Sequence, residues 1–387
     1  MGRLRNAAWR MRDFFRRDAV LAIACVLAAA SCMAVPPDAG YAAYIDWRTI
    51  GLLFSLMVAT SGLARAGVLA RACRALVRAC NSGGVLIAAL VGLTFFVSMV
   101  VTNDVALVAF VPLALAALRE AGLVRRLAFA IACMTVAANV GSMLTPIGNP
   151  QNIYLLSVSG MDAAELVGIM APYSAAAFAL FAAAIGIAEL RDRKRFKHVP
   201  SQMAGVSPKA PQKSFALRDV LPWIALIAVC LLCVARVAPV WLVVAASIAL
   251  ALVFDMRALR HVDYALLFTF VAFFIFVGNV ARIDAVREAV AALVDGRALF
   301  VGVVASQAIS NVPAAILISG FTTDWPALLV GVNIGGLGTL IASMASLISY
   351  KQLAVAYPEL KGYYFRLFTG LNCAFLAALL VLAVAIS

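Results

Sequence analysis

The sequence predicts an all-α polytopic membrane protein built from two repeats of inverted topology. Hydrophobic residues make up 65% of its 387 residues and charged residues only 13%, against roughly a half and a quarter in soluble domains. Long apolar runs recur along the chain, and an uncharged polar segment in the first half returns in weaker form in the second. Such features are typical of a transporter with broken helices at the membrane midplane.

About nine apolar runs are long enough to cross roughly 30 Å of hydrocarbon as helices. They cover residues 19–36, 48–64, 127–158, 163–189, 219–235, 239–255, 263–280, 325–349 and 362–386. Two further runs, 83–118 and 297–320, are interrupted by Thr102-Asn103-Asp104 and by Ser310-Asn311. We expect each of these two runs to form a re-entrant hairpin, which enters and leaves the membrane on the same side.

The positions of Lys and Arg predict the orientation, because short cytoplasmic segments carry an excess of them. With the N-terminus in the cytoplasm, 26 of the 31 basic residues lie inside, since the other five are Arg48, Arg236, Arg282, Arg287 and Arg297. An odd number of spans then places the C-terminus outside. The net charge of +13 therefore indicates topology in the cell (inner) membrane and not nucleic-acid binding. We interpret residues 19–36 as a signal anchor; the alternative, cleavage near residue 39, leaves the later orientation unchanged.

The chain divides into four segments. Residues 1–18 are a basic cytoplasmic N-terminus, 19–190 the first transmembrane repeat, 191–218 a basic cytoplasmic linker rich in Pro, Ser and Gln, and 219–387 the second repeat. Under the predicted orientation the span at 48–64 runs inward and the span at 263–280 runs outward. The two repeats are therefore expected to be inverted.

The polar segment at residues 139–152 is partly duplicated 194 residues later. Asn139, Gly141 and Thr145 pair with Asn333, Gly335 and Thr339, while Ser343 and Ser346 replace Asn149 and Asn152. Backbone freed from a helix at membrane depth is tolerated only where it is buried in protein or lines a polar cavity, and paired interruptions in two halves point to a binding site. The alternative is that Pro146 and the glycines only kink packed helices.

We predict that the hairpin tips and the broken spans form one two-fold site. Unwound carbonyl and amide oxygens suit a monovalent cation, and the N-termini of half-helices suit an anion. The lining offers no strong nucleophile, which argues against an enzyme. The predicted substrate- or ion-binding residues are Thr102, Asn103, Asp104, Asn139, Gly141, Thr145, Pro146, Gly148, Asn149, Asn152, Ser310, Asn311, Asn333, Gly335, Gly336, Thr339, Ser343 and Ser346.

Asp104 is the acidic residue placed deepest in the predicted fold. A carboxylate in a membrane interior costs on the order of 3 kcal/mol, so its default interpretation is a cation or proton site. The alternative is that Asp104 caps the second arm of its hairpin by accepting free backbone N–H groups. The second hairpin has Val312 at the corresponding position, so this feature belongs to one repeat only.

These motifs resemble the ion transporter superfamily over nearly the whole chain from about residue 45. That group includes divalent-anion/sodium symporters, citrate-metal transporters, arsenite permeases and sodium/proton antiporters. In the symporters, Ser-Asn-Thr signatures at both tips hold sodium and the substrate carboxylate; here the third position is Asp104 in one tip and Val312 in the other. The Asn-Asp pair is closer to the arsenite-permease and antiporter branch. The resemblance also implies a homodimer with elevator-like movement.

We therefore expect a secondary active transporter of a small carboxylate or inorganic anion, coupled to sodium or protons and embedded in the lipid bilayer. An arsenite efflux permease or a sodium/proton antiporter is the alternative. An intramembrane enzyme would need an Asp cluster or a His near a membrane face, and the chain lacks a phosphate-binding loop of the G-x-x-x-x-G-K-[ST] type. No cofactor is expected other than a coupling sodium ion or proton, and no metal other than sodium.

Overall fold

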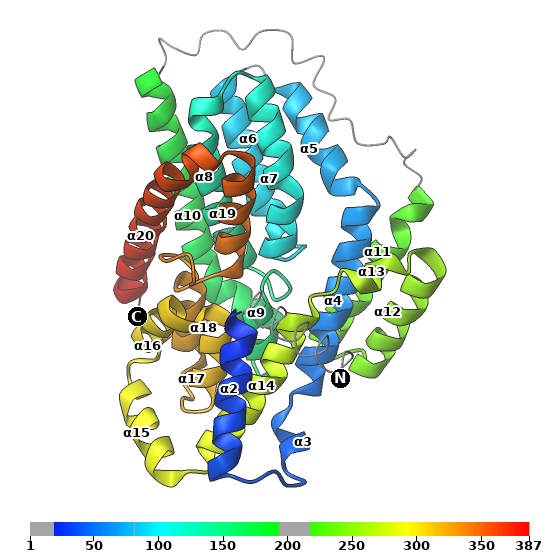
Figure 1. Cartoon of the computed structure of the whole chain (residues 1–387), viewed down its shortest axis with the longest axis vertical. Coiled ribbons are helices and arrows are strands. Elements are labelled where there is room, and N and C mark those ends of the chain that lie inside the picture. The colour runs from blue at the N-terminus through cyan, green and yellow to red at the C-terminus, as the bar shows by residue number, and fades with distance from the viewer. Residues whose placement is uncertain (1–18, 81, 193–216, 387) are drawn as a thin grey trace, which may run out of the picture.

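The computed structural model of the chain describes residues 19–80, 82–192 and 217–386, and every regular element in these ranges is a helix (Figure 1). The predicted N-terminal segment 1–18 and residues 193–216 of the predicted linker lie outside the described residues. The prediction of an all-α polytopic membrane protein is confirmed at this level.

The helices follow one another in the order that the apolar runs predict. In the first half they are α2 (Ala19–Ala34), α3 (Tyr41–Tyr44), α4 (Trp47–Arg65), α5 (Val68–Ala79), α6 (Gly83–Ser98), α7 (Asn103–Glu120), α8 (Leu127–Ser142), α9 (Pro150–Ser159) and α10 (Ala163–Asp192). In the second half they are α11 (Leu221–Val234), α12 (Val240–Phe254), α13 (Arg257–Arg260), α14 (Tyr264–Ala281), α15 (Asp284–Val294), α16 (Ala298–Ile309), α17 (Asn311–Ser319), α18 (Trp325–Ile334), α19 (Met344–Ala356) and α20 (Lys361–Ile386).

Six helical segments in the described part of the chain are long and apolar enough to cross a membrane. They are Trp47–Arg65, Val124–Ser142, Ala163–Ile187, Leu217–Val234, Tyr264–Ala281 and Pro358–Ile386, and a seventh results if α15 and α16, bent by 109° at their junction, count as one span. Helices α2 and α12, which correspond to the predicted spans 19–36 and 239–255, are shorter apolar helices.

The predicted interruptions occur where the polar residues stand. Residues 99–102 separate α6 from α7, and residues 143–149 separate α8 from α9; Ser310 separates α16 from α17, and residues 335–343 separate α18 from α19. Figure 1 shows the α6–α7 pair in the upper half of the molecule and the α16–α17 pair in the lower half. The broken ends of both halves thus lie between the two hairpins.

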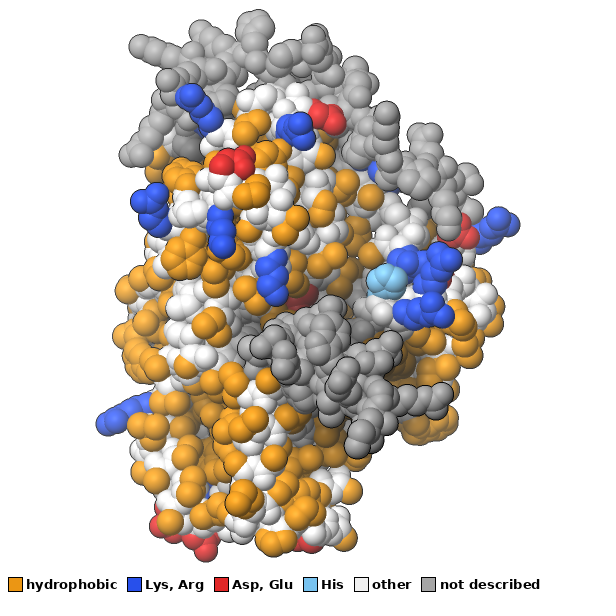
Figure 2. Space-filling model, viewed as in Figure 1, with side chains coloured by type: hydrophobic (Ala, Val, Ile, Leu, Met, Phe, Trp, Pro, Cys, Tyr) orange, Lys and Arg blue, Asp and Glu red, His pale blue; other side chains and the backbone are white. Residues whose placement is uncertain are grey.

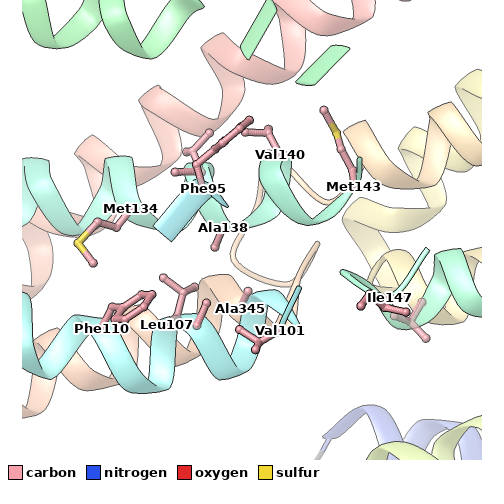
Figure 3. Close-up of a cluster of buried hydrophobic side chains, with 14 of the residues drawn as sticks. Phe95, Val101, Leu107, Phe110, Met134, Ala138, Val140, Met143, Ile147 and Ala345 are labelled. Atoms are coloured by element: carbon pink, nitrogen blue, oxygen red, sulfur yellow. The ribbon is translucent and has the colours of Figure 1, made fainter. Parts of the chain in front are cut away.

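Helix α8 forms the centre of the upper half, and its residues Leu127 to Ser142 are almost all buried. Small side chains such as Ala138 let neighbouring helices approach closely, which is how membrane helices gain van der Waals contact. Figure 3 shows Phe95 of α6, Phe110 of α7 and Ala345 of α19 in the buried cluster around it. This packing holds the first break and the first hairpin in fixed relation.

Three further helix pairs join the first half of the sequence to the second. Helix α2 packs on α14, and α11 and α12 pack on α4. Asn279 of α14 donates hydrogen bonds to Ser31 Oγ at 3.0 Å and to Tyr41 Oη at 2.8 Å, which fastens α2 and α3 to it. Helix α4 also contacts α9, and α14 contacts α17. These two long helices therefore reach the first break and the second hairpin.

Candidate functional site

Each hairpin tip is bonded to the broken span of its own half in the same way. The backbone N–H of Asn103 donates to the carbonyl of Gly148 at 3.3 Å, and the N–H of Asn311 donates to the carbonyl of Ala342 at 3.0 Å. Gly148 and Ala342 stand at corresponding places in the duplicated segment. The two halves therefore share one docking register at the hairpin tips.

The duplicated threonines make a second matching pair of bonds. Thr145 Oγ1 donates to the carbonyl of Met99 at 2.5 Å, and Thr339 Oγ1 donates to the carbonyl of Gln307 at 3.2 Å. Met99 and Gln307 each stand four residues before the tip asparagine of their hairpin. The duplicated threonines thus hold each break against the first arm of its hairpin.

The duplicated glycines allow this close approach. A Cβ at Gly141 would collide with the carbonyl oxygen of Phe95, and a Cβ at Gly335 would lie 2.9 Å from Ser306 Oγ. At Gly336 it would lie 2.8 Å from Nδ2 of the tip residue Asn311. A side chain at Gly141 has no space beside the α6 backbone, and one at Gly335 or Gly336 has none beside the side chains of the second hairpin.

Asn139 connects the first hairpin to the second break. Its Oδ1 accepts from Asn103 Nδ2 at 3.0 Å and from Ser343 Oγ at 3.0 Å. Its Nδ2 donates to Ser346 Oγ and to the Gly336 carbonyl, both at 3.5 Å. The Asn139 amide thus connects the end of α8 to the end of α18 and the start of α19, because an amide can donate and accept at once.

Asn333 makes the corresponding connection from the other half. Its Nδ2 donates to Asn152 Oδ1 at 2.8 Å, and its Oδ1 accepts from Gln151 Nε2 at 3.3 Å and from Asn149 Nδ2 at 3.5 Å. Gln151 is 1% exposed and was not among the predicted site residues, although it stands within the polar segment. The two asparagines kept in the duplication therefore bond across the two halves.

Four helix N-termini converge on a small central cavity of about 20 Å³. Its lining includes the first residues of α7, α9, α17 and α19. It also includes Asn149 and Ser343, the N-cap residues of α9 and α19. Backbone N–H groups in the first turn of a helix have no partner within that helix and carry partial positive charge. Converging N-termini favour an anion or a polar solute with acceptor oxygens.

A larger access cavity of about 510 Å³ lies beside the central one. It is bounded by α4, α5, α7, α14 and α19, and it shares Asp104, Pro150, Leu266 and Met344 with the central cavity. His261 and Asp263 also line it, as does Arg65, which pairs with Asp255 at 2.6 Å. The central cavity is therefore reached through a wide space on one side of the molecule.

Asp104 lies in the wall between the two cavities. Its Oδ1 is buried and has no hydrogen-bond partner among the residues that the structure describes. Thr102 is the N-cap position of α7, and the Asp104 N–H is itself bonded to Asn103 Oδ1 at 2.9 Å. Asp104 therefore does not cap the helix, and the capping interpretation is wrong.

The remaining predicted residues lie around this centre with different exposures. Pro146 is buried within the first break, and Ser310 has a left-handed backbone with φ 73° at the second tip. Thr339 is exposed, so it braces the break and does not line the central cavity. Among the described residues no group of three or more His, Cys, Asp or Glu could hold a metal ion.

Gln307 is a second residue that sequence reasoning missed. Its Nε2 donates to the carbonyls of Gly335 at 2.7 Å and Leu337 at 2.8 Å, and its Oε1 accepts from the Thr339 N–H at 2.9 Å. In the first break Asn152 Nδ2 has this role, since it donates to the carbonyls of Met143 and Thr145. Each break is thus braced by an amide, but from different elements.

Comparisons of the sequence with known proteins show which family it belongs to. A family-wide sequence profile described as citrate transporter matches residues 7–323. The chain belongs to the citrate transporter family. An uncharacterized transporter of Methanocaldococcus jannaschii is 32% identical over 308 residues, which cover 79% of this chain and 81% of that protein. The inner membrane protein YbiR of Escherichia coli is 32% identical over 317 residues, 80% of each chain.

A shorter match covers part of the chain. The silicon efflux transporter LSI3 of Oryza sativa is 35% identical over 121 residues, 31% of this chain and 24% of that protein. The family and these relatives identify a multi-pass membrane transporter of the ion transporter superfamily.

Proposed function

We propose that this chain is a secondary active transporter which carries a small carboxylate or inorganic anion, coupled to a sodium ion or a proton at Asp104. The observation that carries the proposal is the convergence of the N-termini of α7, α9, α17 and α19 on the central cavity. Each N-terminus is equivalent to roughly half a positive charge. Together they attract an anion without any Lys or Arg, and none of the described residues that line the cavity is basic.

Asp104 supplies the reason for coupling. Its unpartnered, buried Oδ1 lies in the same cavity wall as the helix N-termini. A charged carboxylate there opposes a nearby anion, whereas a bound sodium ion or proton removes that opposition. Anion and cation therefore favour each other's binding, and this reciprocity is what symport requires. The Asp104 carboxylate and the amide oxygens of the neighbouring tips are the ligands that a sodium ion would use.

The matching hairpin and break contacts support two repeats of opposite orientation, 19–190 and 219–387. Transporters of this design expose a central site to each side in turn by moving one part against the other. Arg65 and His261, which line the access cavity, stand in segments that the distribution of Lys and Arg predicts to be cytoplasmic. They favour its opening to the cytoplasm, with the N-terminus inside and the C-terminus outside the inner membrane. The proposal includes a homodimer only because the resemblance to the superfamily implies one.

A second candidate cargo is a neutral hydroxylated solute such as arsenious or silicic acid. Two observations favour it: the named function of the rice relative, and the four amide side chains and one hydroxyl in the central lining, which can bind hydroxyl groups of a neutral solute. A sodium/proton antiporter built around Asp104 alone is the third reading.

Thermal stabilisation of the purified protein tests these readings, because a ligand that binds only the folded form raises its stability by mass action. Sulfate, phosphate, succinate, citrate, arsenite and silicic acid would each be added with sodium, without sodium, and at two pH values. We expect one anion to stabilise the protein only with sodium or at the lower pH. Stabilisation by arsenite or silicic acid alone would select the neutral solute, and a response to sodium or pH without any solute would select the antiporter.

A further inference from the structure

A third hollow, of about 530 Å³, lies between α7 and α19 at a distance from the central cavity. On α7 its lining runs from Pro112 to Arg119, and on α19 and the turn after it from Lys351 to Tyr357. The access cavity is lined by the preceding parts of the same helices and shares Pro112 with this outer hollow. The two spaces thus follow one another along the α7–α19 pair.

Both helices run away from the central cavity, since their first residues line it. An α-helix rises about 1.5 Å per residue. Lys351 stands seven residues after Met344, and Arg119 fifteen residues after Asp104, so they lie roughly 10 and 22 Å along the helices from the central site. Figure 2 shows that most visible Lys and Arg side chains lie on this upper half of the molecule.

The two basic side chains of the outer hollow are exposed and free to bind an anion. Among the described residues neither Arg119 nor Lys351 makes an ion pair, and the acidic Glu120 and Glu359 nearby do not line the hollow. Within the described part of the chain, Gln352 Oε1 is buried without a hydrogen-bond partner. The Gln352 and Tyr357 side chains add N–H and O–H donors, and the volume suffices for a small anion with water, which takes about 30 Å³ per molecule.

We propose that Arg119 and Lys351 form a peripheral site that captures the anionic substrate from solution on one side of the membrane before it moves through the access cavity to the helix N-termini. This inference rests on the proposed function, because its ligand is the transported anion. Basic residues at the outer end of a low-dielectric path raise the local concentration of an anion and its rate of arrival, and salt weakens the effect. None of the described residues that line the central cavity is basic, and the field of a helix N-terminus falls off within about one turn, so attraction over a longer distance must come from elsewhere.

The test compares Arg119→Gln, Lys351→Gln and the double variant with matched controls Arg125→Gln and Lys361→Gln. The controls remove one exposed positive charge from the same part of the molecule without touching the outer hollow. Initial rates would be measured against anion concentration in inside-out and right-side-out vesicles made from phosphatidylcholine, at low and high ionic strength. The anion would be the one that stabilises the wild-type protein most.

We expect KM to rise on the order of threefold to tenfold for each charge removed. Such fields raise the local substrate concentration and the association rate by roughly ten- to thousandfold in total. The rise should occur in one vesicle orientation, shrink at high salt, and leave the maximal rate unchanged. Equal KM in variants and controls would overturn the proposal, and so would a fall in maximal rate alone. An effect seen only after phosphatidylglycerol is added would instead assign the hollow to a lipid headgroup. A wild-type protein that moves no anion would overturn the proposed function as well.

Discussion

The asparagine side chains of the site act as two-sided connectors between elements that are distant in sequence. Asn139 accepts from the first tip and from Ser343, and Asn333 bonds to Asn152 and Gln151. Leaving a buried partner of such a bond unsatisfied costs about 1–3 kcal/mol. An amide is preferred to a charged group here because it satisfies both donors and acceptors without the desolvation cost of an ion.

We predict that Asn103→Ala and Asn311→Ala each abolish transport while the protein still folds and inserts. Asn103 loses its bond to Asn139, and both tips lose a polar group in the central cavity. Uptake into proteoliposomes, with gel filtration to check folding, measures this. Asn372→Ala is the control, since Asn372 is a buried asparagine that bonds only within α20. Normal transport by both tip variants would remove the site from the hairpin tips.

We predict that Asp104→Asn removes the dependence of transport on sodium or pH, because the neutral amide no longer needs a cation beside the anion. Rates measured over a sodium series and over a pH series show the change, and the exposed Asp219→Asn variant serves as control. If the variant keeps the wild-type cation dependence, the coupling ion binds elsewhere.

The sequence predicted Asp104 and the paired asparagines because membrane depth makes polar groups conspicuous and because they recur in the second copy. It missed Gln307 because that residue does not recur in the other copy. The residue that corresponds to Gln307 in the first hairpin is Met99, which is apolar, so comparison of the copies gave no signal. Gln151 was missed because residue 345 of the second copy is alanine.

At the level of elements, the two breaks are braced differently. The brace of the α8–α9 break comes from Asn152 in the helix that follows it, whereas that of the α18–α19 break comes from Gln307 in the hairpin. The second hairpin and its break are therefore bonded as one unit by four hydrogen bonds of Gln307 and Thr339.

Removal of this brace should destabilise the second half. Gln307→Ala leaves two carbonyls and one N–H without their partner, at about 1–3 kcal/mol for each group that water cannot reach. We expect a lower thermal unfolding midpoint and weaker substrate binding than in the wild type. Gln352→Ala is the control for the unfolding midpoint alone, since Gln352 Oε1 has no partner to lose among the described residues but the residue lines the outer hollow. Equal midpoints for the two variants would show that water replaces the brace.

Close helix contact at the duplicated glycines gives a further prediction. Gly141→Ala and Gly335→Ala place a methyl group against backbone or Ser306, and overpacking costs about 1–3 kcal/mol or more. Both variants should unfold at a lower temperature and lose transport. Gly168→Ala and Gly186→Ala, in α10 with nothing within 4 Å of the added Cβ, should be neutral or stabilising, because alanine is the better helix former. A neutral Gly141→Ala variant would contradict the tight docking of α6 on α8.

On the scale of the whole molecule, the docking of the two halves is the part that the sequence could not predict. Periodicity and breakers place the helices, the tips and the breaks along each half. They do not say that Asn333 bonds to Asn152 across the centre, because that bond depends on how two separately folded surfaces meet. The crossed packing of α2 on α14 and of α12 on α4 is likewise a property of the assembled molecule.

The arrangement of the hairpins in Figure 1 leads to a prediction about the intact membrane. If the α6–α7 and α16–α17 hairpins enter from opposite faces, the segments at their bases must lie on opposite sides. Arg125, after α7, and Asp295, before α16, are both exposed. Single Arg125→Cys and Asp295→Cys variants would be made in a background lacking Cys25, Cys32 and Cys373, the cysteines with exposed surface.

We expect a membrane-impermeant maleimide to label the Asp295→Cys variant in intact cells and the Arg125→Cys variant only in inside-out vesicles. Labelling of both from the same side would contradict the inverted arrangement, and reversed labelling would keep the inversion but turn the whole protein over. The result also bears on the peripheral anion site, since Figure 1 shows α7 and α19, which carry Arg119 and Lys351, in the upper part of the molecule, and Arg125 follows α7 directly. The side that exposes residue 125 must then be the side on which loss of their charges raises KM.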